Sequence, residues 1–219
     1  MADIGKTSSY AGRANTVLVF GHGDGATAVI TTVVVRVREK GGGERVRFTG
    51  PATFEKKTAD HIMEVVLSAA DSILRALNLP EKYFDISVVN LDAASITEVG
   101  LNISGFSADV PILLAILSAS LQMAVPEDIV STGHIASPDG DIRMVRNLPT
   151  KFAAAVEANS IKRFVHPAIA EESSLTLFFR VRDKKRMTPS PEPSGASGQL
   201  PSTTWANWFG QSFRTKKQR

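Results

Sequence analysis

Cysteine is absent from the 219-residue chain, and this single absence removes several classes of function. Without thiols there is no disulfide framework, no cysteine nucleophile and no cysteine-ligated zinc site. Long apolar runs are also missing, since the longest, Val110–Val125, contains one proline and several polar residues. This run is too short and too polar to span a bilayer. The first ten residues lack the apolar segment of a secretory signal, so we expect a cytoplasmic protein without membrane association.

Basic residues are in excess only at one end of the chain. Residues 180–219 hold nine basic and two acidic side chains, a formal charge of +7, whereas the rest holds 16 basic and 20 acidic, a charge of −4. The body of the protein is therefore mildly acidic, and its charge does not favour nucleic-acid binding.

The composition predicts three segments along the chain: a flexible N-terminus (1–11), a folded domain (12–183) and a basic tail (184–219). The tail is rich in proline, serine and glycine over Met187–Thr204 and has no periodicity, so we expect disorder. The aromatic residues of Trp205–Phe209 precede its basic end. They indicate a docking element that binds an acidic partner or a nucleic-acid strand. The alternative is a solvated tail without a specific role.

Apolar periodicity predicts both strands and helices for the domain. Three β-branched runs separated by glycine turns predict an antiparallel meander: Thr16–Phe20, Thr27–Val37 and Arg45–Phe48. Spacings of three and four between apolar residues predict three main helices: Thr58–Leu77, Ser107–Met123 and Leu148–Ala158. Further short strands are expected at Phe84–Val89, Ile129–Ile135, Ile142–Val145, Arg163–His166 and Thr176–Val181.

Motifs for a nucleotide or a metal are incomplete. Gly5-Lys6-Thr7-Ser8 is similar to the end of a P-loop, but the sequence has no glycine five residues before it and no strand leads into it. Gly21–Gly25 leads into a β-rich run instead of a helix, so we interpret it as a turn. His61 and Glu64 offer two metal ligands one helical turn apart, but no second pair completes a site. We therefore expect neither ATP binding, nor another cofactor, nor a metal.

Ser107 is a candidate nucleophile. It follows Ser104-Gly105-Phe106, where a glycine turn leads into the apolar second helix. The backbone N–H groups of Phe106, Ser107 and Ala108 lie at the positive end of the helix dipole, where they can stabilise an oxyanion. The alternative is that Ser107 is only the N-cap of this helix, a position in which serine is common.

Lys151 is the candidate general base. It falls in the first turn of the third helix, and the residues that share its face, Ala154, Ala155 and Ala158, are small and apolar. Desolvation and the helix dipole should both lower its pKa, and a neutral amine can activate a serine. The alternative is a lysine that extends its amine into water.

Four segments around these residues resemble the proteolytic domain of Lon proteases in order and spacing: Gly105-Phe106-Ser107-Ala108, Ser131–Ile135, Gly140-Asp141-Ile142 and Leu148–Ala155. Arg47-Phe48-Thr49-Gly50 is also similar, and the likeness covers about residues 12–180. The resemblance implies an α/β fold of the ribosomal S5 domain 2-like kind, with mixed sheets and about three main helices. It also implies a Ser107/Lys151 dyad in which the Thr132 hydroxyl orients the lysine amine.

The chain departs from the Lon pattern at four positions. The family usually has an acid at Ser104, proline or a similar residue at Phe106, glycine at Asp109 and an acid at His134. The segments Ile112–Leu117 and Arg143-Met144-Val145 are also similar to Lon-like domains of RadA-type recombination ATPases and magnesium-chelatase-like competence proteins. Those relatives generally lack the dyad and do not cut peptides.

Together these features predict a serine endopeptidase that hydrolyses unfolded polypeptides. Because the AAA+ motor of Lon is not in the sequence, we expect either ATP-independent action or delivery of substrates by a separate ATPase or regulator. The resemblance further implies a homo-oligomeric ring. The alternative is a non-catalytic Lon-like domain that serves as a binding or assembly module.

Overall fold

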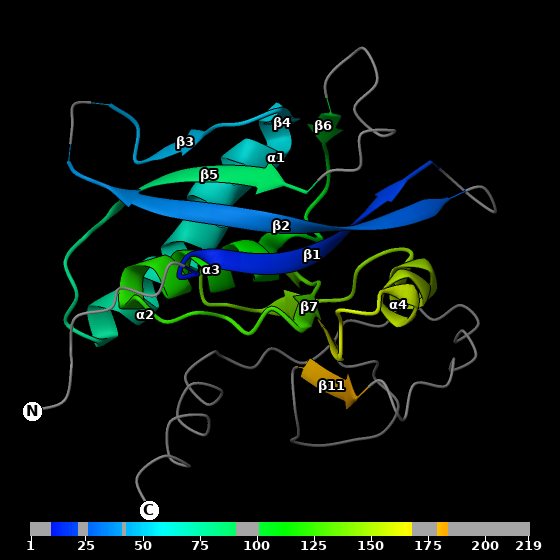
Figure 1. Ribbon diagram of the computed structural model, residues 1–219. Coiled ribbons are helices and arrows are strands. Elements are labelled where there is room, and N and C mark those ends of the chain that lie inside the picture. Colours follow the sequence, from blue (N-terminus) through cyan, green and yellow to red (C-terminus); the bar gives the residue numbers. More distant parts are fainter. Residues whose placement is uncertain (1–9, 22–25, 41–42, 91–100, 168–178, 184–219) are drawn as a thin grey trace, which may run out of the picture.

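A seven-stranded mixed sheet forms the centre of the computed structural model (Figure 1). Its strands, in spatial order, are β11 (Phe179–Asp183), β10 (Arg163–Pro167), β7 (Ile129–Ser131), β1 (Arg13–Phe20), β2 (Thr27–Arg38), β5 (Tyr83–Val89) and β3 (Val46–Phe48). The structure describes residues 10–21, 26–40, 43–90, 101–167 and 179–183. Most of the expected flexible N-terminus, most of the Gly21–Gly25 turn and the whole 184–219 tail lie outside the described residues.

The predicted meander is correct for its first two strands and wrong for the third. β1 and β2 pair antiparallel from Arg13 opposite Val34 to Phe20 opposite Thr27. The other edge of β2 pairs with β5, and β3 pairs parallel with β5 instead of β2. β5 is longer than β3 and buries alternate apolar side chains, so it offers β2 the larger surface for pairing.

Two short strand pairs complete the sheet structure. β4 (Ala52–Phe54) and β6 (Leu101–Ile103), neither of which was predicted, pair in parallel. β8 (His134–Ile135) and β9 (Ile142–Arg143) form a hairpin closed by a hydrogen bond from Gly140 N–H to Ser137 O. The predicted strand Ile129–Ile135 is thus broken at Thr132 and Gly133.

Three main helical segments pack against the sheet, which confirms the expected mixed α/β architecture. The first runs without interruption through α1 (Lys56–His61), the π-helical η2 (Ile62–Val66) and α2 (Leu67–Ala76). The second is α3 (Asp109–Leu121), in which eleven of 13 residues are buried, as expected for a central helix. The third is α4 (Leu148–Glu157). Within the described parts of the chain, none of these helices has the length and apolarity needed to cross a membrane.

The helices lie on both faces of the sheet. Along β1, Ala14 and Leu18 join the large apolar cluster with α3, whereas Val17 joins a smaller cluster with Ala155 of α4. Because successive side chains of a strand point to opposite faces, α3 and α4 cover opposite faces.

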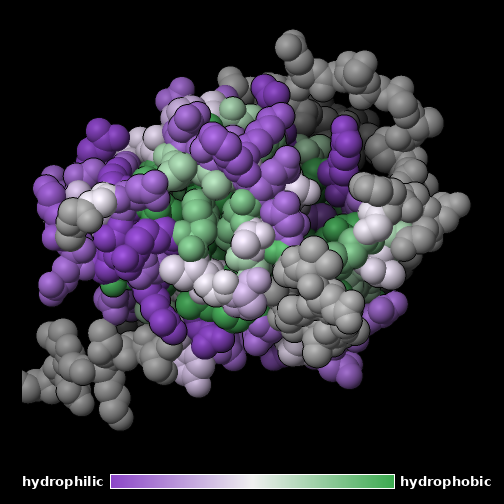
Figure 2. Space-filling view, turned by 90° about the horizontal axis from the view of Figure 1, so that it is seen from above, coloured by the Kyte–Doolittle hydropathy of each residue, from purple (hydrophilic) through white to green (hydrophobic). Residues whose placement is uncertain are grey.

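On the side of β3 and β4, apolar side chains gather in the middle of the face and polar ones surround them (Figure 2).

Candidate active site

Ser107 lies in the loop between β6 and α3. Gly105 has a φ of +79° in this loop, which glycine adopts without strain, and it turns the chain into the helix. The helix begins at Asp109 and its N-cap residue is Ala108, so the predicted start was two residues early and the N-cap alternative for Ser107 is wrong. The Ser107 hydroxyl is therefore not engaged in capping the helix.

Lys151 reaches Ser107 from α4 and is almost completely buried, with 2% of the residue exposed. Its Nζ atom lies 2.8 Å from Ser107 Oγ, 3.1 Å from Thr132 Oγ1 and 3.0 Å from the backbone oxygen of Val17. The alternative of a lysine extended into water is therefore wrong. The structure brings together the three side chains predicted from the sequence, although the outer two are 44 residues apart.

The apolar surroundings of the amine change its acidity. Ala155, one turn after Lys151, is buried in a cluster with Val17 and Phe164, which anchors this face of α4 against the sheet. Burial lowers the pKa of Lys151 from its ordinary 10.5 to about 8, because the charged form loses its hydration. At mildly alkaline pH a large fraction of the amine is thus neutral.

The hydrogen-bond partners direct the lone pair of this neutral amine. A neutral amine has two N–H bonds to donate and one lone pair that accepts. The Val17 carbonyl only accepts, and Thr132 Oγ1 donates its own proton to Ser107 O at 2.9 Å, so it also accepts from Lys151. With both N–H bonds used, the lone pair faces Ser107 Oγ and can take its proton.

Gly133 lets the chain after β7 pack closely against the start of α3. Its N–H donates to Ser107 O at 3.0 Å, the same oxygen that accepts from the Thr132 hydroxyl. A Cβ atom at Gly133 would lie only 2.6 Å from Val110 Cγ2, so a larger residue cannot fit without movement. The glycine therefore allows the contact that holds the loop carrying Ser107.

Gly133→Ala is expected to displace the start of α3 and so separate Ser107 from Lys151. We expect a loss of about 1–3 kcal/mol in the free energy of unfolding and of at least ~10-fold in kcat/KM for an unfolded substrate. Urea unfolding and a cleavage assay measure the two effects. Val110→Ala removes the clashing methyl, so the double variant should lose less than the sum of the single losses. Strictly additive losses would contradict the clash.

The predicted oxyanion donors lie beside Ser107, the candidate nucleophile. Within the described residues, the backbone N–H groups of Phe106, Ser107 and Ala108 donate no hydrogen bond to another protein atom. They lie at the N-terminus of α3, where the helix dipole favours a developing negative charge. A carbonyl oxygen of a substrate attacked by Ser107 would develop its charge at this end of the helix.

A second polar cluster next to the dyad was not predicted. Asp109 is 1% exposed, and its Oδ2 atom lies 3.0 Å from His61 Nε2 and 2.9 Å from His134 Nδ1. The same oxygen accepts from the Ile135 N–H at 3.0 Å. The hydrogen bond with Asp109 raises the pKa of His61 above its ordinary value. The sequence offered Glu64 as a second metal ligand beside His61 and no pair to complete a site, whereas folding brings Asp109 and His134 next to His61.

The sequence signal for this cluster was Asp109 itself. An acid at the start of an otherwise apolar, buried helix needs partners, because an unpaired buried carboxylate is costly. Those partners are 48 and 25 residues away in the sequence, at His61 and His134. No local pattern could have identified them.

An open groove and a smaller cavity lie at the surface of the described part of the chain. An open groove of about 530 Å³ lies between Phe106, His61 and the charged residues around α1, such as Lys57 and Glu64. Because Phe106 lines it, the groove adjoins the loop that carries Ser107.

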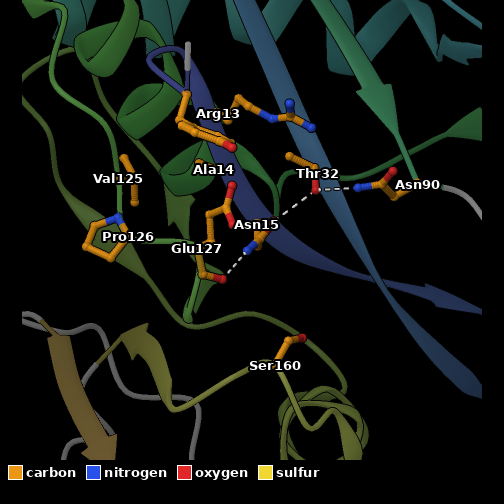
Figure 3. Close-up of a pocket in the computed structure, with 10 residues that line it drawn as sticks. Arg13, Ala14, Asn15, Thr32, Asn90, Val125, Pro126, Glu127 and Ser160 are labelled. Atoms are coloured by element: carbon orange, nitrogen blue, oxygen red, sulfur yellow. Dashed lines mark hydrogen bonds between the residues drawn. The ribbon is translucent and has the colours of Figure 1, made fainter. Parts of the chain in front are cut away.

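The second cavity, of about 230 Å³, does not include any dyad residue (Figure 3). In it, Asn15 donates to Glu127 O and accepts from the Thr32 hydroxyl, which in turn accepts from Asn90. These neutral groups therefore satisfy one another's hydrogen bonds.

In comparisons with known proteins, no family model matches the chain, and no curated protein matches it significantly. The case for a function therefore depends on the geometry around Ser107.

Proposed function

We propose that the protein is a serine endopeptidase of the Lon-like type, with Ser107 as nucleophile and Lys151 as general base. The observation that carries the proposal is the 2.8 Å distance between Ser107 Oγ and the buried Lys151 Nζ. Burying a lysine without a carboxylate partner is costly, and the lowered pKa is what a general base near neutral pH requires. The alternative, a non-catalytic binding or assembly module, gives no reason for this contact.

In the proposed reaction, the Ser107 hydroxyl gives its proton to the Lys151 lone pair while Oγ attacks the scissile carbonyl carbon. The carbonyl oxygen becomes the oxyanion, held by backbone N–H groups of Phe106, Ser107 and Ala108. Lys151 then returns the proton to the leaving nitrogen as the C–N bond breaks, which leaves an acyl ester on Ser107. Water, deprotonated by the same amine, hydrolyses the ester and restores the hydroxyl.

The arrangement of the chain supports the Lon-like fold as part of this proposal. The resemblance to the Lon proteolytic domain was based in part on three segments: the Gly105 loop, the Thr132–Gly133 break and α4. Each of them contributes atoms to the proposed dyad or to its hydrogen bonds. Unfolded polypeptides are the proposed substrates, as the resemblance to the Lon proteolytic domain implies. A homo-oligomeric ring and delivery by a separate ATPase remain predictions.

A serine-directed phosphonofluoridate tests the proposal, since it reacts with an activated serine hydroxyl. At pH 8.5 we expect one adduct per chain, mapped by mass spectrometry to Ser107, together with cleavage of a casein-like unfolded substrate. Ser107→Ala should abolish both. Ser104→Ala is the matched control, because Ser104 lies exposed in the same loop and should not be required. Equal labelling or equal cleavage by the Ser107→Ala protein would overturn the assignment.

A further inference from the structure

The cluster beside the dyad has the geometry of a small coordination site. His61, Asp109 and His134 each offer one ligand atom, and these three atoms all lie within 4.8 Å of one another. In a tetrahedral site with bonds of about 2.0–2.1 Å, neighbouring ligand atoms are about 3.3 Å apart. The two N···O distances, 3.0 and 2.9 Å, are already close to this value. Only small side-chain shifts are needed to place an ion between the three atoms.

We propose that His61, Asp109 and His134 form a binding site for a divalent transition-metal ion of the Zn²⁺ type. Two imidazole nitrogens and one carboxylate oxygen suit Zn²⁺ and its neighbours, whereas Ca²⁺ and Mg²⁺ prefer all-oxygen sites. The Ile135 N–H, which donates to Asp109 Oδ2, holds the carboxylate in position. Water takes the remaining coordination position.

The charge of Asp109 supports this assignment. Its carboxylate is 1% exposed, and in the described part of the chain its only ion-pair partners are the two histidines. A buried carboxylate needs a compensating positive charge, which a dication held by neutral imidazoles provides. The side chains of His61 and His134 are 13% and 23% exposed, and His61 borders the groove of about 530 Å³, so ions and water can reach the site.

The site also connects elements that surround the nucleophile. Its ligands come from α1, the first residue of α3 and β8. The Phe106 ring, adjacent to Ser107 in sequence, packs 4.2 Å from the His61 ring and stacks 5.0 Å from the His134 ring, measured between centroids. An ion held by both rings would fix Phe106 between α1 and β8. Metal binding should therefore stabilise the loop that carries Ser107.

The site is tested by treating the full chain with a chelator and then titrating it with Zn²⁺ in a calorimeter, which measures the heat of binding. We expect one equivalent to bind and, at 100-fold excess over Kd, a Tm increase of about 5 °C or more. Co²⁺ should give a visible absorption band that Zn²⁺ removes. His61→Gln and His134→Gln should each lose the band and the Tm increase. Glu64→Gln, an exposed acid one turn from His61, is the matched control and should retain both.

Ser107→Ala should also bind the metal, so this result does not depend on the peptidase proposal. If either histidine variant fails to fold, a protection experiment on the wild-type protein replaces it. Diethyl pyrocarbonate modifies accessible histidines, and Zn²⁺ should protect His61 and His134 from it, as mapped by mass spectrometry. Four results would each overturn the site. They are unchanged Zn²⁺ binding by His134→Gln, loss of binding by Glu64→Gln, absence of protection at both histidines, and no heat of binding up to ~1 mM Zn²⁺.

Discussion

Replacement of Lys151 by methionine is expected to lower kcat/KM for an unfolded polypeptide by about 10³-fold or more. The variant keeps the length and apolar stem of the side chain but has no lone pair to accept the Ser107 proton. The expected loss is in the chemical step, because the Lys151 amine contacts Ser107, Thr132 and Val17 and the residue is only 2% exposed, so it offers a substrate almost no surface. Steady-state cleavage of a fluorogenic unfolded substrate measures it.

Two further variants separate a general base from a structural cation. Lys151→Arg retains a positive charge and hydrogen-bond donors but does not deprotonate, so it should be as inactive as the methionine variant. Lys162→Met is the matched control, because its side chain is 73% exposed and its closest ionic contact, with Asp128, is 3.9 Å long. Substantial activity in Lys151→Arg would remove the lysine from the mechanism.

The sequence was sufficient to predict the helices and most strands but not their partners. Helix periodicity is local, so α3 and α4 were located within two residues of their observed ends. β3 was assigned to the wrong neighbour because strand pairing depends on which distant segment offers the better surface, and β5 does so for β2. The three-residue strands β4 and β6 are too short to show an alternation.

The contact between Ser107 and Lys151 was predictable because each of the two residues has a local signature. Ser107 follows a glycine turn at the start of an apolar helix, and Lys151 shares a helix face with alanines. The cluster around Asp109 had no such signature, because its ligands come from three separate elements. Three of the four departures from the Lon pattern, Phe106, Asp109 and His134, are in contact with one another or with His61. These three positions therefore belong to one cluster beside the contact between Ser107 and Lys151.

The pH dependence of cleavage is the second large effect expected. Because only neutral Lys151 can accept the Ser107 proton, kcat/KM should rise about tenfold per pH unit below pH 8 and level off above about pH 9. Between pH 6 and 9 this amounts to about a hundredfold change. An inflection near 10.5 would indicate an amine in water, and one near 6.5 a histidine. His61→Gln, assayed with a chelator present, should leave the inflection unchanged.

The same pKa must appear in the stability of the protein. Lys151 has its ordinary pKa of 10.5 in the unfolded chain and about 8 in the folded one, so between these values the unfolded state binds more protons. The free energy of unfolding of the wild type should therefore rise with pH across this window, by about 3 kcal/mol relative to Lys151→Met. Below pH 8 both states are protonated, and the difference between the two proteins should be constant. Urea unfolding at intervals from pH 7 to 10.5 measures the two slopes. Parallel slopes would show that Lys151 titrates normally, whatever the rate profile.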